Sequence, residues 1–167
     1  FGYKGNLGQD CVRVFSARGH ETILVDNDDL DIFSEPEVSG YTTGHSPDII
    51  INAIAYNDVD GAEKPENKEV AAYLNSVFPK TLAETAAKLR IPFVHFSTDY
   101  VFAGTKKDGY KEVDLPNPIS FYGTSKLLGE KAIEATGGKY YILRTSKLFG
   151  RPGLSSYSKP SFLSLMV

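Results

Sequence analysis

The chain has 167 residues, which is within the size of one domain and long enough to bury a hydrophobic core. Its 41% hydrophobic and 23% charged residues are ordinary for a soluble globular protein, and its formal net charge of -3 argues against a nucleic-acid partner. No apolar run approaches the roughly 18 residues of a membrane-spanning helix, so no membrane partner is expected. The single cysteine, Cys11, excludes an internal disulfide and favours a reducing, cytoplasmic location. The histidines lack metal-ligand spacing, so no metal site is expected.

The first element predicted is a helix over residues 7–18, opened by a glycine-rich turn. Three glycines share the spacing GxxGxxG: Gly2, Gly5 and Gly8. They would allow a tight turn and a close approach of the backbone to a pyrophosphate at the start of the helix. Asn6 and Leu7 would then lie beside the cofactor. An ordinary glycine-rich turn is the alternative.

A short buried strand is predicted at residues 22–25, and Asp26 follows it about 18 positions after Gly8. An acid at this place accepts hydrogen bonds from the adenosine ribose in dinucleotide-binding folds. An acidic turn is the alternative, since more aspartates follow. No lysine or arginine occurs between Asp26 and Lys64 to hold a 2′-phosphate, which favours NADH over NADPH.

The middle of the chain alternates between apolar and turn-forming stretches. Residues 32–47 predict a loop with at most a short helix. A buried strand at 49–51 leads into small residues at 52–55, which would pass close to a flat cofactor or would simply pack tightly. A polar loop follows, and then a helical stretch at 66–89. This stretch is expected to break near Asn75, which could cap its second part.

The second half predicts a strand at 93–96, a long loop at 103–120, a helix at 122–135 and a strand at 140–143. A loop this long in a compact domain is usually functional. Strands that alternate with helices predict a doubly wound, parallel α/β sheet of the Rossmann type, with residues 1–167 as one dinucleotide-binding domain.

Tyr122 and Lys126 would share one face of the last helix, because positions i and i+4 are neighbours there. An ammonium about 4 Å from a phenol favours the phenolate by roughly 4 kcal/mol at a surface-like dielectric, or about three pKa units before desolvation is counted. The pair therefore predicts a proton donor and acceptor. The polar segments 97–102 and 144–146 would lie near it, because ligands bind beyond the carboxyl ends of parallel strands.

Five stretches together carry a resemblance to a known family: Gly2–Gly8, Pro47–Tyr56, Val59–Glu63, His95–Gly104 and Phe121–Glu130. The most specific motifs are STDYVFAGT and YGTSK. With them the chain resembles the extended short-chain dehydrogenase/reductases, and within these the branch of the dTDP-4-dehydrorhamnose reductases. The resemblance implies NADH or NADPH as cofactor and a dTDP-4-keto-6-deoxyhexose as substrate, with a homodimer as a further possibility.

The resemblance also implies a role for each matching residue. The catalytic set is Tyr122, Lys126 and Thr98. Positions that contact the cofactor are Gly2, Gly5, Asn6, Leu7, Gly8, Asp26, Asp31, Ile32, Ala55, Tyr56, Asn57, Tyr122 and Lys126. Positions that contact the substrate are Thr98, Asp99 and Lys147. Tyr122 would protonate the alkoxide as hydride reaches C4, which is worth about 10²–10⁴-fold. Lys126 would lower the pKa of Tyr122 and bind the nicotinamide ribose, while Thr98 would hydrogen-bond the carbonyl oxygen.

Lys147 departs from the family pattern, which usually has Trp after Arg-Thr-Ser. The lysine would either point to solvent, with Phe149 or Tyr100 covering the sugar, or contact a phosphate or a more polar sugar. Both ends also depart, because only Phe1 precedes the glycine turn and the chain stops in an apolar run. We expect about five residues to be missing in front and a sugar-binding part behind.

Three other functions stay open at this point. The first is another extended nucleotide-sugar reductase, epimerase or dehydratase. The second is a dinucleotide-binding regulatory subunit of the kind found beside methionine adenosyltransferase. The third is a chain that has no activity alone.

Overall fold

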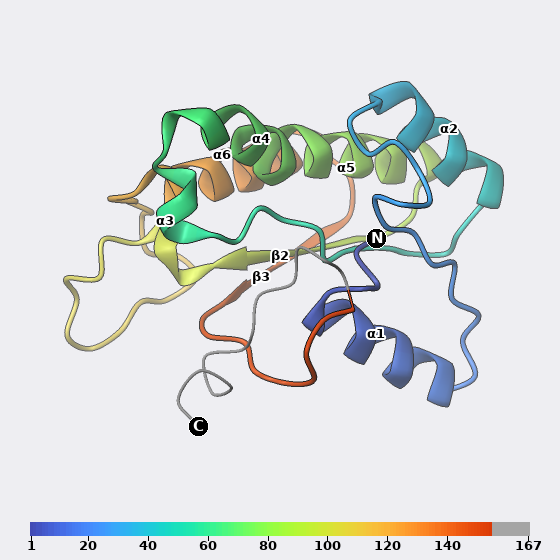
Figure 1. The fold of residues 1–167 in the computed structure, drawn as a ribbon, viewed down its shortest axis with the longest axis horizontal. Coiled ribbons are helices and arrows are strands. Elements are labelled where there is room, and N and C mark those ends of the chain that lie inside the picture. The colour runs from blue at the N-terminus through green and yellow to red at the C-terminus, as the bar shows by residue number, and fades with distance from the viewer. Residues whose placement is uncertain (155–167) are drawn as a thin grey trace.

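A computed structural model describes residues 1–154 and places a parallel sheet between two layers of helices (Figure 1). The strands of the described part are β1 (Ile50–Asn52), β2 (Phe93–Thr98) and β3 (Tyr140–Thr145), and they lie in that order in the sheet. One face is covered by α4 (Lys68–Ala72), α5 (Phe78–Leu89) and α6 (Phe121–Ala135), while α1 (Asn6–Ala17) lies on the other. The predicted doubly wound α/β sheet of the Rossmann type is thereby confirmed.

The register of the sheet brings the carboxyl ends of its strands together. Phe93 pairs with Ile50 on one side and with Tyr140 on the other, and the pairing of β2 with β3 continues to Thr98 and Thr145. All these pairs are parallel, so the polar residues that follow each strand meet at one edge. The predicted strands at 49–51, 93–96 and 140–143 are therefore present, each within a residue or two.

The hydrophobic core lies between the sheet and the covering helices. One buried cluster joins Phe93 of β2 with Phe78 and Leu82 of α5 and Ile133 of α6. These four side chains are essentially unexposed, and full burial of each is worth roughly 1.5–3 kcal/mol. The cluster holds α5 and α6 against the strands and so fixes the helix that carries Tyr122.

The helical stretch 66–89 is interrupted as expected, but not by a helix cap. A 3₁₀ turn (Pro65–Asn67) and α4 lead into a π-helical turn, Tyr73–Val77, which runs directly into α5. Asn75 lies in the π turn and does not cap α5. Its amide instead accepts from the Tyr56 N–H at 2.9 Å and donates to the Tyr56 carbonyl at 3.0 Å. The π turn thus places a buried amide where it satisfies the backbone of a distant loop.

The prediction of a loop with at most a short helix at 32–47 is wrong in the extent of the helix, because the 11 residues of α2 (Glu35–His45) occupy most of the segment. Glycines and threonines give this segment little intrinsic helix propensity. Its contacts with α5 decide the outcome: Thr81 donates to Glu35 at 3.0 Å and Thr85 donates to Ser39 at 3.1 Å. The polar loop after Tyr56 likewise contains a short helix, α3 (Val59–Ala62).

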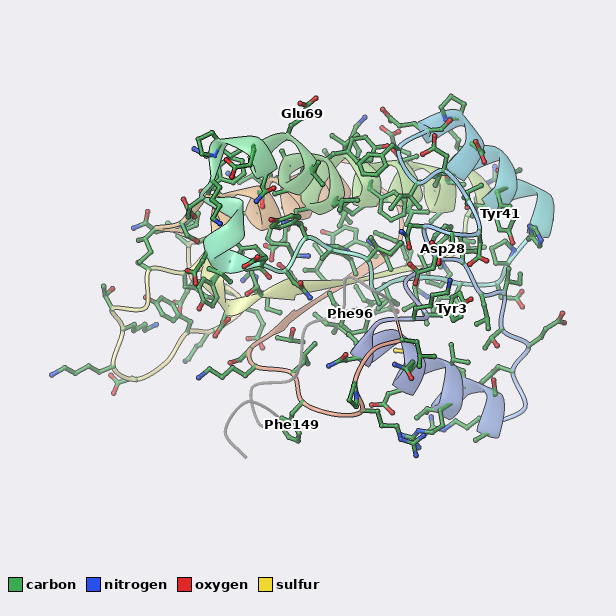
Figure 2. All side chains as sticks on the ribbon, in the orientation of Figure 1. Tyr3, Asp28, Tyr41, Glu69, Phe96 and Phe149 are labelled. Atoms are coloured by element: carbon green, nitrogen blue, oxygen red, sulfur yellow. The ribbon has the colours of Figure 1, made fainter. Side chains whose placement is uncertain are left out.

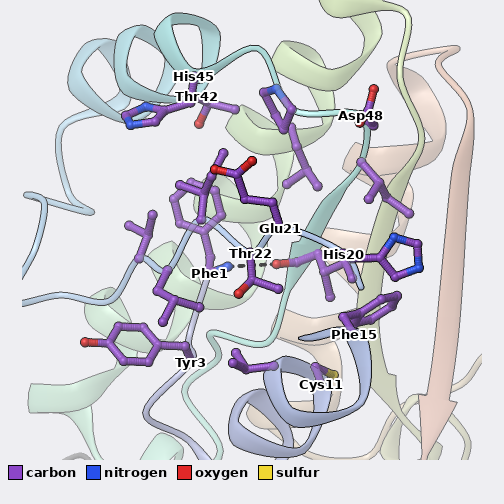
Figure 3. Close-up of a pocket in the computed structure, with 18 of the residues that line it drawn as sticks. Phe1, Tyr3, Cys11, Phe15, His20, Glu21, Thr22, Thr42, His45 and Asp48 are labelled. Carbon is purple, nitrogen blue, oxygen red and sulfur yellow. Dashed lines mark hydrogen bonds between the residues drawn. The ribbon is translucent and has the colours of Figure 1, made fainter. Parts of the chain in front are cut away.

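The strand predicted at 22–25 is not formed. A strand needs hydrogen-bonded partners along its whole length. The bond from the Gly2 N–H reaches this segment at the Val25 carbonyl, which is its last residue, and so does not build a ladder along it. A cavity of about 560 Å³ lies beside it, between α1 and residues 45–51 (Figure 3). Ile23 and Leu24 consequently stay 40% and 39% exposed.

Residues 103–120 contain no helix or strand, as predicted. The base of this loop is ordered by the rings of Phe102 and Tyr110, which stack with their centroids 4.3 Å apart. An ion pair between Lys106 and Asp114 at 2.7 Å joins its two arms. The loop then leads directly into Ser120, whose hydroxyl accepts from the Gly123 N–H and begins α6.

Candidate active site

The glycine-rich turn makes a close backbone contact that leaves no room for larger residues. Gly2 has a φ of +84°, and a Cβ there would lie 2.8 Å from the Ala53 carbonyl carbon. A Cβ on Gly8 would overlap the carbonyl of Gly2. The turn is therefore packed against the residues that follow β1. Asn6 and Leu7 form the first turn of α1 directly behind it.

Asp26 lies beside this turn and is only 7% exposed. Its carboxylate accepts from the backbone N–H of Lys4 at 3.1 Å and from that of Asn27 at 3.0 Å. The Lys4 ammonium pairs with Asp28 at 2.6 Å, and Figure 2 shows Tyr3 and Asp28 close together at this place. A cation is thus present beside this acidic turn although none follows Asp26 before Lys64, because Lys4 belongs to the glycine turn itself.

The other predicted cofactor positions lie along the same edge of the sheet. Ile32 is buried, and its carbonyl accepts from the Tyr73 hydroxyl at 3.1 Å, while Asp31 is exposed. Ala55 and Tyr56 are partly buried after β1, and Asn57 is exposed. Asn75 joins this segment to α6, because it also donates to the Ser125 hydroxyl at 2.9 Å.

Tyr122 and Thr98 come together at the carboxyl end of β2. Tyr122 is 8% exposed, and its ring meets that of Tyr100 edge-on with 5.6 Å between centroids. The Thr98 hydroxyl accepts from the Tyr100 N–H at 3.2 Å and begins the short 3₁₀ turn Asp99–Val101. Gly123 is required here, because a Cβ would overlap the Tyr100 carbonyl. The glycine of the YGTSK motif thus lets α6 seat against the end of β2.

The pKa of Tyr122 does not move in the predicted direction. Burial raises it above its ordinary value, and the hydrogen bond with Thr98 lowers it by less. The negative charge of Asp99 raises it further. The desolvation of a buried phenol opposes the effect expected from the Lys126 ammonium, and the depth of burial is not visible in the sequence.

Lys126 is fully buried one helical turn after Tyr122. Its Nζ donates to the Phe96 carbonyl at 2.7 Å and lies 3.3 Å from His95 Nε2. Burial lowers the pKa of Lys126 to about 8, against the opposing effect of the Glu130 charge. With this pKa, Lys126 can gain or lose its proton close to neutral pH.

A buried polar network behind these residues was not foreseen from the sequence. His95 of β2 is fully buried and lies 3.2 Å from the Asn52 amide of β1. Glu130 of α6 accepts two hydrogen bonds from the Arg144 guanidinium, at 2.9 and 2.6 Å, and one from the Ser97 hydroxyl at 2.5 Å. Within the described chain every buried side-chain nitrogen or oxygen has a partner. The one signal in the sequence was the polar residue His95 inside an apolar strand.

The residues considered for sugar contacts occupy different places. Tyr100 lies against Tyr122, whereas Phe149 is 72% exposed and projects on the side of the sheet that carries α1 (Figure 2). Lys147 is exposed two residues beyond the last β2–β3 pair. The cavity of Figure 3 lies elsewhere, since neither Thr98 nor Tyr122 lines it.

The fold and this edge of the sheet define a Rossmann-type α/β protein with a tyrosine and a lysine one helical turn apart. The sequence profile of the family described as the RmlD substrate binding domain matches residues 1–167, and the chain belongs to this family.

Named relatives agree with this assignment. A probable low-salt glycan biosynthesis reductase of Haloferax volcanii is 37% identical over 165 residues, which cover 93% of this chain and 54% of that protein. A dTDP-4-dehydrorhamnose reductase of Aggregatibacter actinomycetemcomitans is 37% identical over 153 residues, or 91% and 51%. A crystal structure of dTDP-4-dehydrorhamnose reductase from Bacillus anthracis in complex with NADP superimposes with a TM-score of 0.90 at 32% identity, covering 99% of this chain and 56% of that one. The chain spans about half the length of the relatives it matches. Within the described residues, no helix is long and apolar enough to cross a membrane.

Proposed function

We propose that the protein to which this chain belongs reduces the 4-keto group of dTDP-4-dehydro-L-rhamnose with NADH or NADPH, giving dTDP-L-rhamnose. The observation that carries the proposal is the convergence of Thr98, Tyr122 and Lys126 at the carboxyl end of β2. This is the edge at which open α/β sheets bind ligands. The names of the relatives, reductases of this sugar among them, support the substrate.

The residues at the glycine turn fit a dinucleotide. Gly2 and Gly8 leave bare backbone where a Cβ would collide, and α1 begins directly behind them. Asp26 holds the turn through the Lys4 N–H, with an acidic group where a ribose would lie. When bound, the reduced nicotinamide supplies the hydride. The family roles of Asn6, Leu7, Asp31, Ile32, Ala55, Tyr56 and Asn57 as cofactor contacts are part of this proposal.

The chain's own groups would position the substrate and supply the proton. The Thr98 hydroxyl lies within hydrogen-bond reach of the phenol of Tyr122, and in this structure it donates to Asp99 at 3.3 Å. A keto oxygen placed between Thr98 and Tyr122 would accept from both. Tyr122 keeps its proton at neutral pH because burial raises its pKa, which suits a general acid. Lys126 lies one helical turn from Tyr122 in a site without bulk water, where its pKa of about 8 lets it gain or lose a proton close to neutral pH. Asp99 and Lys147 would contact the sugar nucleotide.

The deciding experiment is an NAD(P)H-oxidation assay of the full-length protein with dTDP-4-keto-L-rhamnose. Tyr122→Phe should lower kcat by at least about 10²-fold and leave cofactor affinity nearly unchanged, because only the transferable proton is lost. Tyr110→Phe, in the exposed loop, is the matched control and should keep wild-type turnover. Wild-type turnover in Tyr122→Phe would end the assignment of the acid.

A second candidate is reduction of a different 4-keto nucleotide sugar. Exposed Lys147 in place of the family's usual Trp favours it, and so does the glycan biosynthesis reductase among the relatives. Turnover of another sugar, with none of the rhamnose precursor, would select this candidate, and restored activity in Lys147→Trp would identify the residue responsible.

A homodimer in the cytoplasm belongs to the same proposal, and light scattering of the full-length protein tests the dimer.

A further inference from the structure

Lys126 contacts a buried histidine, and the hydrogen bonds around that histidine have a direction. Burial holds the pKa of His95 well below its ordinary value, so the ring is neutral. A neutral imidazole has one N–H donor and one acceptor nitrogen. Both ring nitrogens of His95 face a partner: Nδ1 lies 3.2 Å from the Asn52 amide nitrogen, and Nε2 lies 3.3 Å from Lys126 Nζ.

The backbone after β1 settles which nitrogen carries the proton. The Ile54 N–H donates to Asn52 Oδ1 at 2.9 Å, which fixes the orientation of the Asn52 amide. Its NH₂ group then faces His95 Nδ1 and must donate to it, so Nδ1 is the acceptor. The proton of His95 therefore lies on Nε2, the nitrogen that faces Lys126. Turning the amide around would bring two donors together at Ile54.

A histidine that donates toward Lys126 favours one charge state of the lysine. An ammonium has donors only, whereas an amine has a lone pair that can accept the Nε2–H. The amine keeps an N–H for the Phe96 carbonyl at 2.7 Å, so both contacts are satisfied in the neutral form. The charges that face this pair are those of Glu130 on α6, which favours the ammonium, and of Arg144 on β3, which is paired with Glu130.

We propose that His95 is a positioning residue that donates from Nε2 to Lys126 and thereby favours the amine, with Asn52 setting the direction of this hydrogen-bond chain. The proposal rests on the proposed function, in which Lys126 serves the proton donor Tyr122. The backbone that follows β1 would then help to set the pH range of the reaction through a hydrogen-bond relay that does not touch the substrate.

The direct test is the tautomer of His95 in the cofactor-free, full-length protein, read from long-range ¹H–¹⁵N correlations at about pH 9, above the pKa of Lys126. His95→Gln identifies the signals. We expect the proton on Nε2, and a proton on Nδ1 would overturn the proposal.

The second experiment reverses the direction of the hydrogen bonds that lead from Asn52 through His95 to Lys126. In Asn52→Asp, the carboxylate can accept from both the Ile54 N–H and His95 Nδ1–H, which leaves Nε2 to accept from an ammonium. We expect the tautomer to switch to Nδ1–H. The pKa of Lys126, followed by the ¹³Cε shift, should rise by at least about one unit, with the same shift in the acidic limb of the kcat/KM profile.

Asn75→Asp is the matched control, because it places an equal charge at another fully buried amide that contacts Tyr56 and Ser125 instead of His95. An equal rise in the pKa of Lys126 in both variants would show an effect of charge alone and would overturn the relay. The tautomer is measured without substrate, so the expected tautomer together with no reductase activity would contradict only the proposed function.

Discussion

The ion pair between Arg144 and Glu130 gives a stability prediction that the structure makes quantitative. Glu130 is 1% exposed and receives two bonds from Arg144 and one from Ser97. Arg144→Met keeps an unbranched side chain of similar reach and removes the charge. The Glu130 carboxylate would then be buried with the Ser97 hydroxyl as its remaining partner from this cluster. Arg13→Met is the matched control, because Arg13 pairs with Asp10 on the surface of α1.

The expected magnitudes differ because the burial differs. Removal of one partner from a buried pair costs about 3–5 kcal/mol, since a buried charge is left uncompensated. The Arg144 side chain is 23% exposed, so water can reach the site, and we expect the lower end, about 3 kcal/mol. In the Arg13 pair the side chains are 59% and 38% exposed, and such pairs contribute about 0–1 kcal/mol.

Urea unfolding followed by circular dichroism measures the difference. With a slope of about 2 kcal/mol/M, Arg144→Met should lower the midpoint by about 1.5 M and Arg13→Met by less than about 0.5 M. Adding Glu130→Gln to Arg144→Met should recover part of the loss, because the unpaired charge disappears while Ser97 keeps an acceptor. Equal midpoints for the two arginine variants would refute the reasoning.

Three further predictions concern the site. Lys126→Met should change the pH dependence of stability. Burial lowers the pKa of Lys126 from 10.5 to about 8, so the unfolded chain binds more protons than the folded chain between these pH values. From pH 7 to pH 10 the free energy of unfolding of the wild type should therefore rise by about 2–3 kcal/mol relative to that of the variant. Gly123→Ala should lower the free energy of unfolding by about 1–3 kcal/mol and kcat by about 10²-fold, because the added methyl group overlaps the Tyr100 carbonyl. The same change at Gly40, where nothing lies within 4 Å, should leave kcat unchanged. Lys4→Ala should weaken binding of NADPH more than of NADH in calorimetric titrations, since the Lys4 ammonium lies on Asp28, two positions after Asp26. Equal losses for the two cofactors would contradict a contact of Lys4 with the 2′-phosphate.

Local patterns were enough to predict the elements that position the site. The apolar run before Ser97, the spacing of Tyr122 and Lys126 and the turn at Gly2–Gly8 each specify structure within a few residues. Such signals depend on side-chain period and on backbone conformation, which the sequence displays directly.

The remaining features depend on contacts between distant residues. The helix α2 forms because Thr81 and Thr85 bond to it from α5, across more than 40 positions. Asn75 satisfies Tyr56 and Ser125 rather than its own helix. The pKa of Tyr122 likewise depends on how deeply the phenol is buried, which no local pattern reports.

The two glycines of α6 have a consequence for how this site could change in evolution. Gly123 rests against the carbonyl of Tyr100, and Gly129 rests against that of Asn75, so both contacts are made to main chain. A core side chain can be exchanged for another of similar volume with little effect on where these carbonyls lie. The hydrophobic interior is therefore free to diverge among descendants while Tyr122 keeps its place, and substitutions at these two glycines should be the ones that lineages with an active enzyme do not accumulate.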